Sequence, residues 1–277
     1  MLSLKEISQK TKLIDIRKVL DERKTENRFI NYLLEDKVPL SLCYKDKTII
    51  NIKSLDGKII TVYEKIMDLN SDYVILVCSN NDDYLRAETL FNDYKFNTFI
   101  LDCGNSLKDY SKLYIDILCL IDYLKNLDSQ KKIYLYGSML GANAITPVLK
   151  TDVVNKLNAV ILNQISLSVL KDKYISFCNE QNDKYNPKIL NSSKNRINKI
   201  QSIDINLLDE PQENLKDNTI PLVFISNLDK TDVEYIKFLT VYNSTKGIKK
   251  ILCLNKNNYI IDLKNNFYKI IDEIKKY

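Results

Sequence analysis

Histidine is absent from all 277 residues of this chain. Neutral imidazole is the usual general base beside a serine or cysteine nucleophile, and it is also a common metal ligand. Its absence therefore excludes a Ser-His or Cys-His catalytic pair and every metal site that mixes cysteine with histidine. From the sequence we expect neither a metal nor a cofactor.

The cysteines show no spacing that would compensate for this absence. No C-x-x-C pair occurs, and the six thiols are scattered as Cys43, Cys78, Cys103, Cys119, Cys178 and Cys253. Several lie within apolar strand or helix patterns, where a free thiol packs as a small hydrophobic group. We interpret them as reduced structural thiols of a cytoplasmic protein.

Long apolar runs are missing as well. The segment that begins Met1-Leu2-Ser3-Leu4-Lys5-Glu6 has no apolar core of the kind that a signal peptide carries. Nowhere in the chain do about 18 uncharged apolar residues follow one another. We therefore expect neither a secretory signal nor a membrane span.

The chain also has little excess of one charge and few glycines. Its 41 Lys and Arg stand against 36 Asp and Glu, interleaved along most of the sequence. A dedicated nucleic-acid binder would concentrate its basic residues on one face, so we expect no nucleic-acid partner. Only five glycines occur, and neither phosphate-binding loop pattern, G-x-x-x-x-G-K-S/T or G-x-G-x-x-G, is present.

The first pattern that is present is helical and covers residues 1–38, within an N-terminal extension that we assign to residues 1–44. Ser3 and Glu6 form a capping box, and apolar residues recur downstream at helical spacing as Leu13, Ile16, Val19 and Leu20. This extension either packs on the main domain or binds a partner.

A hairpin and a series of apolar strands follow. Thr48–Lys53 and Lys58–Tyr63 alternate in polarity around the turn Asp56-Gly57, which predicts a β-hairpin. Further strands are expected at 72–78, 96–101, 132–136, 157–162, 221–225 and 250–254, with helices at 83–94, 109–127, 143–149 and 266–276. Apolar strands that alternate with helices predict an α/β fold, with a mainly parallel sheet of about eight strands covered by helices on both faces.

Residues 166–218 interrupt this alternation. They include the polar segments Asn191-Ser192-Ser193-Lys194-Asn195 and Asp209-Glu210-Pro211-Gln212-Glu213. We expect a helical cap insertion over the carboxyl edge of the sheet, within a main domain of residues 45–277.

The strand that ends at Tyr136 runs into the turn Gly137-Ser138-Met139-Leu140-Gly141-Ala142. This turn has the form of a nucleophile elbow, G-x-S-x-G, with Met139 at the position of the nucleophile. A thioether has no proton to release and forms no anion, so Met139 cannot perform acyl transfer. The flanking glycines are expected to serve packing, because a tight strand-to-helix turn needs small residues.

With this turn, the elements from about Thr48 to Tyr277 resemble the α/β-hydrolase superfamily, in particular its esterase-like and thioesterase-like members. The resemblance implies that residues 133–149 are the nucleophile segment and that 166–218 are the cap between the sixth and seventh strands. It also implies that Asp229, or its rival Asp232, is the triad acid and that Asn258 holds the place of the triad histidine. An amide does not accept and return a proton near neutral pH, so the chain resembles a degenerate member of the superfamily.

The resemblance further implies a ligand pocket at the carboxyl ends of the strands, beneath the cap. The residues expected there are Cys78, Ser79, Cys103, Ser138, Met139, Leu140, Asp229 and Asn258. Ser138, Cys103 and Cys78 are the fallback nucleophiles, although we expect Ser138 to be a solvated turn residue. The loop of the oxyanion hole reads Cys78-Ser79-Asn80-Asn81 and lacks the usual glycines.

Three functions follow from these observations. The leading hypothesis is a catalytically inactive α/β-hydrolase-fold protein that binds a small acyl-like ligand or a protein partner. The alternative is an active esterase, thioesterase or acyltransferase with an unorthodox Ser or Cys nucleophile. A third hypothesis is an architectural subunit that assembles through its N-terminal helical arm.

Overall fold

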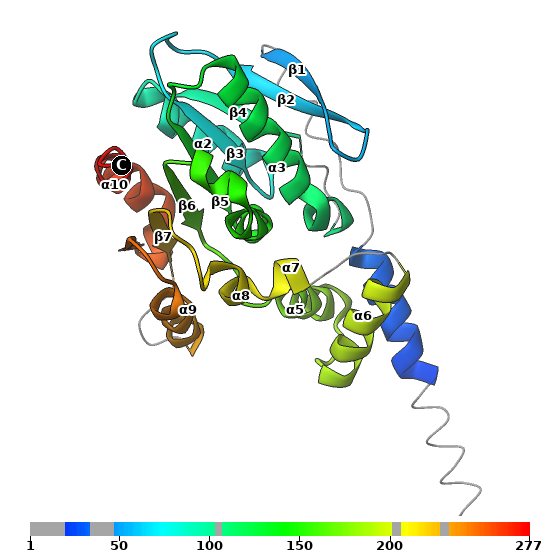
Figure 1. Cartoon of the computed structure of the whole chain (residues 1–277). Coiled ribbons are helices and arrows are strands. Elements are labelled where there is room, and N and C mark those ends of the chain that lie inside the picture. The colour runs from blue at the N-terminus through cyan, green and yellow to red at the C-terminus, as the bar shows by residue number, and fades with distance from the viewer. Residues whose placement is uncertain (1–19, 34–46, 103–106, 201–205, 228–232) are drawn as a thin grey trace, which may run out of the picture. The chain divides into compact units, whose positions relative to one another are not determined.

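The structure, a computed structural model, describes residues 20–33, 47–102, 107–200, 206–227 and 233–277 (Figure 1). The chain divides into two compact units. The sheet unit comprises the described parts of Asp36–Val169 and Asn206–Tyr277, and the helical unit those of Met1–Glu35 and Leu170–Ile205. The capping box predicted at Ser3 lies outside the described residues.

The sheet unit is built on eight strands in the order β1-β2-β4-β3-β5-β6-β7-β8. β1 and β2 form an antiparallel hairpin, β2 pairs antiparallel with β4, and the remaining neighbours are parallel. The predicted sheet, opening hairpin included, is confirmed. The strands are β1 (Thr48–Lys53), β2 (Ile59–Lys65), β3 (Tyr73–Val77), β4 (Asn97–Leu101), β5 (Ile133–Ser138), β6 (Ala159–Asn163), β7 (Leu222–Ser226) and β8 (Lys249–Cys253).

Local sequence explains the hairpin and the central strands. Gly57 has a φ of +85°, a conformation that glycine adopts without steric cost, and its N–H donates to the Ser54 carbonyl at 3.0 Å. Every residue of β3, β4, β5, β6 and β7 is buried. Uninterrupted burial accounts for the continuous apolar runs of these strands, because helices cover both faces of the sheet.

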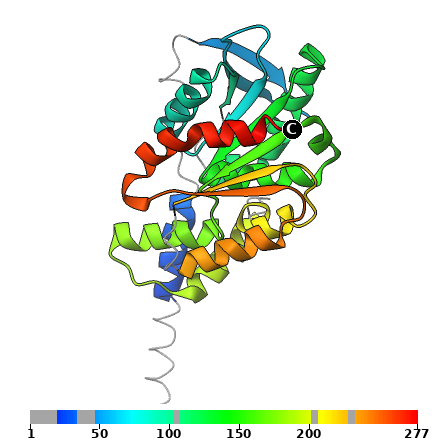
Figure 2. The ribbon, with the colours of Figure 1, turned by 90° about the vertical axis from the view of Figure 1, so that its left-hand side faces the viewer.

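Two long helices share one face of the sheet. α2 (Asn81–Asp93) and α10 (Tyr259–Ile274) meet through Phe91 and Phe267, whose ring centroids lie 5.0 Å apart in an edge-to-face arrangement. Figure 2 shows α10, in red, running across this face. α10 begins seven residues before the predicted start at Asn266. The sequence does not predict the first turns of α10, because Ile260 and Ile261 are exposed there and break the amphipathic pattern.

The remaining elements of the sheet unit include α3, which connects β4 to β5, and α9, which connects β7 to β8. α9 was missed in the sequence because Ile236 is exposed whereas Phe238 and Val241 are buried, so its apolar residues form no single stripe. The bounds are α3 (Leu107–Leu127), α4 (Leu140–Ile145), η2 (Thr146–Lys150), η3 (Asp152–Lys156), α7 (Asn206–Asp209), α8 (Pro211–Leu215), α9 (Val233–Ser244) and η4 (Lys256–Asn258).

The helical unit consists of a helix over residues 20–33, α5 (Val169–Gln181) and α6 (Pro187–Ile200). Its core is aromatic: the Phe29 ring lies 4.7 Å from Tyr174 and 5.4 Å from Phe177. The N-terminal segment and part of the predicted insertion thus fold together, while α7 and α8 of that insertion belong to the sheet unit. That the insertion caps the carboxyl edge of the sheet stays a prediction.

Among the helices of the described residues, none has both the length and the apolar character that crossing a bilayer requires.

Candidate functional site

The elbow after β5 keeps a strained backbone. Met139 has φ 54° and ψ −120°, a region in which residues with side chains are rarely found. Such a conformation costs about 1–3 kcal/mol and persists only where the surroundings impose it. Here the Met139 N–H donates to the Asn163 carbonyl at 2.9 Å, and the Met139 carbonyl accepts from the Ala142 N–H at 3.0 Å. The turn lies after a central strand, as predicted.

The two glycines of the elbow are required by close packing. A Cβ on Gly141 would lie 2.1 Å from the Val77 carbonyl oxygen, and one on Gly137 would lie 2.7 Å from the Ala142 Cα. Neither neighbour is a flexible side chain, so each position admits only glycine without a backbone shift. The close approach of Gly141 to Val77 places the start of α4 directly beside the end of β3.

This approach brings together two segments with available backbone donors. Leu140 opens α4, and Ser79 follows β3 by two residues. Within the described part of the chain, neither the Leu140 N–H nor the Ser79 N–H donates to an acceptor. Met139 directly precedes Leu140, and 44% of its surface is exposed. Each of these two N–H groups is thus available to an acceptor from outside the described residues, such as a carbonyl oxygen.

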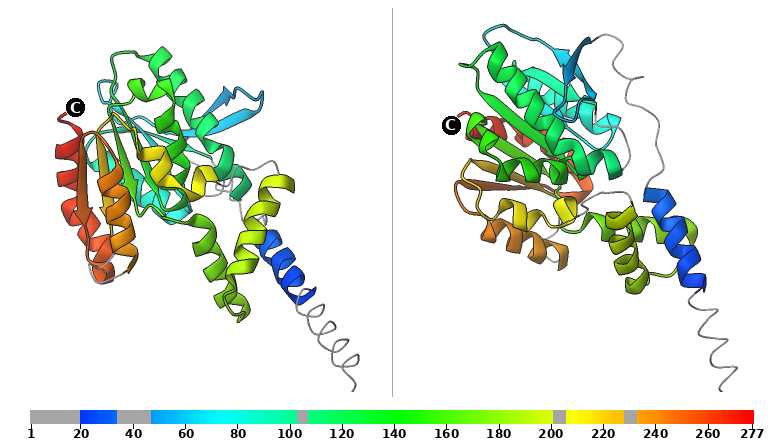
Figure 3. Two further views of the ribbon diagram at one scale, coloured as in Figure 1. Left: turned by 60° about the horizontal axis from the view of Figure 1, so that its bottom comes forward. Right: turned by 45° about the vertical axis from the view of Figure 1, so that its right-hand side comes forward.

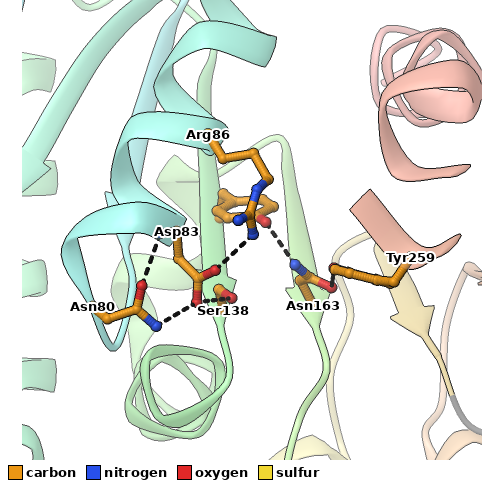
Figure 4. A network of polar contacts seen from close by, with 7 residues as sticks. Asn80, Asp83, Arg86, Ser138, Asn163 and Tyr259 are labelled. Atoms are coloured by element: carbon orange, nitrogen blue, oxygen red, sulfur yellow. Dashed lines mark hydrogen bonds and ion pairs between the residues drawn. The ribbon is translucent and has the colours of Figure 1, made fainter. Parts of the chain in front are cut away.

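Ser138 is turned away from this site. Its side chain is 2% exposed, and its hydroxyl donates to Asp83 Oδ2 at 3.2 Å (Figure 4). The expectation of a solvated serine is therefore wrong. Ser138 is the last residue of β5, and strand alternation puts it on the same face as Tyr136, which packs on Phe91 of α2.

Asp83 is the centre of a polar cluster at the start of α2. Its second oxygen, Oδ1, pairs with Arg86 Nη1 at 3.0 Å, and Asn80 Nδ2 donates to Oδ2 at 3.1 Å. The Asp83 N–H in turn donates to Asn80 Oδ1 at 2.9 Å, which makes Asn80 the N-cap of the helix. Both oxygens of this carboxylate thus have partners within the protein.

A second polar chain reaches the elbow from α10. The Tyr259 hydroxyl donates to Asn163 Oδ1 at 2.6 Å, and Asn163 Nδ2 donates to the Tyr136 hydroxyl oxygen at 2.7 Å (Figure 4). Asn163 is the register partner of Ser138 in the sheet, and its carbonyl is the one that holds the Met139 N–H. Burial raises the pKa of Tyr136 well above its ordinary value and also raises the pKa of Tyr259, so both phenols remain neutral at pH 7.

Tyr259 occupies the region in which the sequence placed Asn258. Asn258 itself is exposed, and its side chain does not cap α10. The loop after β8 therefore meets the elbow through Tyr259. The sequence indicates a role for Tyr259 only through its position next to Asn258. No sequence pattern predicts that Asp83, Arg86 or Asn163 lies near the elbow.

The other predicted pocket residues divide into two groups. Cys78 is fully buried, and its carbonyl accepts from the Tyr110 hydroxyl at 2.7 Å; Ser79 and Leu140 are half-buried. Cys103, Asp229 and Asp232 lie outside the described residues. Over the described ranges, no three His, Cys, Asp or Glu side chains gather where they would hold a metal ion.

Comparison with known proteins gives a fold and no close relative. No family model and no curated protein matches the chain. Among solved structures, Est1E from Butyrivibrio proteoclasticus is similar with a TM-score of 0.57 at 14% identity, over 83% of this chain and 99% of that one. The Pyrococcus furiosus esterase Pf2001 gives 0.56 at 12% identity, over 88% and 94%. An α/β hydrolase from Penicillium, GrgF, gives 0.57 at 11% identity, over 83% and 98%.

The fold is that of the α/β hydrolases. At this level of identity the likeness extends to the fold alone. In this chain the strand-to-helix turn and its two closely packed glycines are present, with Met139 in a strained conformation between them. The chemistry of the site must therefore be argued from this chain's own residues.

Proposed function

We propose that this protein is a non-catalytic α/β-hydrolase-fold protein that binds a small acyl-like ligand at the elbow. The observation that carries the proposal is Met139, which stands in strained elbow geometry and half exposed in a chain that contains no histidine. A thioether contributes contact surface at this position and no nucleophile. The base that would activate a neighbouring nucleophile is absent from the whole sequence.

The burial of the fallback nucleophiles supports inactivity. Ser138 is 2% exposed and donates its hydroxyl proton toward Asp83, away from the elbow surface. Cys78 has no exposed surface, so its thiol is not accessible to a substrate in this structure. Cys103 is the remaining fallback nucleophile, and the experiment below includes it.

The donors around Met139 suggest what the ligand contributes. An acyl carbonyl would accept from the Leu140 and Ser79 N–H groups, which have no acceptor within the described residues. The flexible Met139 side chain would contact the adjoining apolar chain of the ligand. An acyl group bound in this way meets no nucleophile and is released unchanged. A protein partner that presents such a group is the second occupant we consider.

The proposal places the protein in the cytoplasm. Cys78, Cys119, Cys178 and Cys253 are free thiols, as expected of a protein kept in reducing surroundings.

A test of inactivity on the full chain uses activated short-chain esters, a fluorophosphonate probe for serine and a thiol-reactive acyl probe for cysteine. Wild type and the variants Met139→Ala and Cys103→Ser should hydrolyse p-nitrophenyl butyrate at the same background rate, and none should show labelling that substrate prevents. Met139→Ser should remain inactive, because triad groups act together and a serine without a base recovers little. The active alternative would be established instead if the protein were labelled, if substrate prevented this labelling, and if the Cys103→Ser substitution abolished it.

A test of binding uses thermal shift with fatty acids and non-hydrolysable acyl thioethers. Wild type should be stabilised by at least one chain length, and Met139→Lys should lose that shift. Met67→Lys is the matched control, since Met67 is 45% exposed, as Met139 is, but lies after β2. An equal loss in both variants, or no shift for any ligand in wild type, would overturn the acyl-ligand proposal.

A further inference from the structure

A second site lies in the helical unit, where the helix over residues 20–33 runs beside α6 (Figures 1 and 3). A hollow of about 430 Å³ opens between them, lined by Arg23, Glu26 and Asn27 of the first helix and Arg196 of α6. Because residues three and four apart share one face of a helix, Arg23, Glu26 and Asn27 point to the same side. The volume falls within the range of roughly 300–1,000 Å³ that is typical of small-molecule sites.

The two arginines of this hollow form no ion pair within the described residues. Within the described residues neither Arg23 nor Arg196 pairs with a carboxylate, and the Arg196 guanidinium donates only to the Asn27 amide oxygen. Arg28, on the same helix, shows the contrast: it lies 3.4 Å from Asp183 and donates to Gln181 at 2.7 Å. Two guanidinium groups from different helices thus face one hollow whose single carboxylate, Glu26, pairs with neither of them.

Hydrogen bonds fix the first helix before and after the hollow. The backbone that carries Arg23, Glu26 and Asn27 is therefore held in place. Tyr32 donates to Glu180 of α5 at 3.0 Å, and the Asn186 amide donates to Glu22 at 3.4 Å. Phe29, between them, is fully buried against α5. A rigid frame lowers the ordering cost of binding at the hollow.

We propose that this hollow binds a small molecule that carries an oxyanion, a phosphate or a carboxylate, together with a hydroxyl group. Guanidinium groups match both oxyanions with paired N–H donors, so Arg23 and Arg196 would hold the anion. Glu26 has no cationic partner within the described residues and would accept a hydrogen bond from the hydroxyl. This hydrogen bond gives the site a preference for the hydroxylated ligand over the same anion without the glycerol hydroxyls. The site is independent of the elbow.

The experiment is calorimetric titration of the full chain at 0.15 M salt with glycerol 3-phosphate, glycerate, inorganic phosphate and glycerol. We expect one-to-one binding of glycerol 3-phosphate or of glycerate, weaker binding of inorganic phosphate and none of glycerol. The stronger of the first two identifies the oxyanion. Arg23→Gln and Arg196→Gln should each weaken binding roughly tenfold or more, since each removes a charge-assisted contact.

Three further variants make the test specific. Arg28→Gln, the matched control, should change the affinity less than twofold. Arg196→Lys keeps the charge without the planar fork and should lie between wild type and Arg196→Gln, with the fold least disturbed. Glu26→Gln should remove the preference for glycerol 3-phosphate over inorganic phosphate. The proposal is wrong if neither hydroxylated anion binds, or if Arg28→Gln weakens binding as much as Arg23→Gln and Arg196→Gln do.

Discussion

The Ser138 hydroxyl and the Asp83 carboxylate lie 3.2 Å apart and join the end of β5 to the first turn of α2. Ser138 directly precedes the strained Met139, and Arg86 and Asn80 hold Asp83 from the other side. These contacts fix the residue that directly precedes the strained turn. We therefore expect the loss of Ser138 or Asp83 to lower the stability of the protein.

Ser138→Ala should lower the free energy of unfolding by about 1 kcal/mol, the usual worth of a buried hydrogen bond. Asp83→Asn should lower it by about 1–3 kcal/mol, because Arg86 then loses its charged partner. Urea denaturation followed by circular dichroism measures both values. The double variant should be less damaging than the sum of the two, since the residues share one contact. Strict additivity would contradict a coupled pair.

Gly141→Ala should destabilise the protein by about 2–3 kcal/mol or prevent folding, because the added methyl group would lie 2.1 Å from the Val77 carbonyl oxygen. Gly57→Ala is the control: its Cβ would meet no atom within 4 Å, and only its positive φ makes the substitution unfavourable, by about 1 kcal/mol. Chemical denaturation of the two variants should rank Gly141→Ala well below Gly57→Ala. An equal effect would mean that α4 shifts away from β3 without cost.

Local patterns in the sequence were sufficient to predict the sheet. Alternation around Asp56-Gly57 identified the hairpin, and continuous apolar runs identified the central strands. These signals are strong because period-two alternation and full burial leave few alternatives over five or six residues. The spacing of Gly137 and Gly141 likewise located the elbow, since the packing that forbids a Cβ there also keeps the glycines in the sequence.

The polar network around the elbow could not be predicted in the same way. Asp83, Asn163 and Tyr259 reach the ends of β5 and β6 only because the starts of α2 and α10 lie beside those strands, while 176 positions separate the first residue from the last. The orientation of Ser138 depends on where β5 ends, and the sequence ended that strand two residues earlier, at Tyr136. Because β5 continues through Ser138, this side chain lies on the buried face that it shares with Tyr136 and is not part of a solvated turn.

Met139→Gly should stabilise the protein by about 1 kcal/mol, because glycine adopts positive φ without the strain that a side chain meets. The half-exposed methionine gives up little buried surface in exchange. Met67→Gly serves as the control, since Met67 is equally exposed but has no positive φ, and it should destabilise. Urea midpoints of the two variants against wild type give the comparison. A destabilised Met139→Gly would mean that the methionine side chain supports the elbow rather than strains it.

The tyrosines of the network make stability depend on pH in the alkaline range. Burial raises the pKa of Tyr136 and of Tyr259 in the folded state above the value of about 10 that they have when unfolded. Between those values the unfolded chain loses protons that the folded chain keeps, so the folded state binds more protons and stability falls as pH rises. The contribution of each phenol is complete below pH 10 and is lost as pH rises through its folded pKa.

Urea unfolding at pH 8, 10 and 11 should therefore show a falling free energy of unfolding, with a limiting slope of about 1.4 kcal/mol per pH unit for each phenol. Because the chain has no tryptophan, phenolate absorbance at 295 nm follows the same event without interference, and the buried tyrosines should ionise together with unfolding. Tyr136→Phe should be less stable at pH 8, where Asn163 Nδ2 loses its acceptor, and its stability should fall less steeply above pH 10. An unchanged alkaline slope in Tyr136→Phe would show that this hydroxyl titrates freely and that the chain from Tyr259 through Asn163 does not hold it.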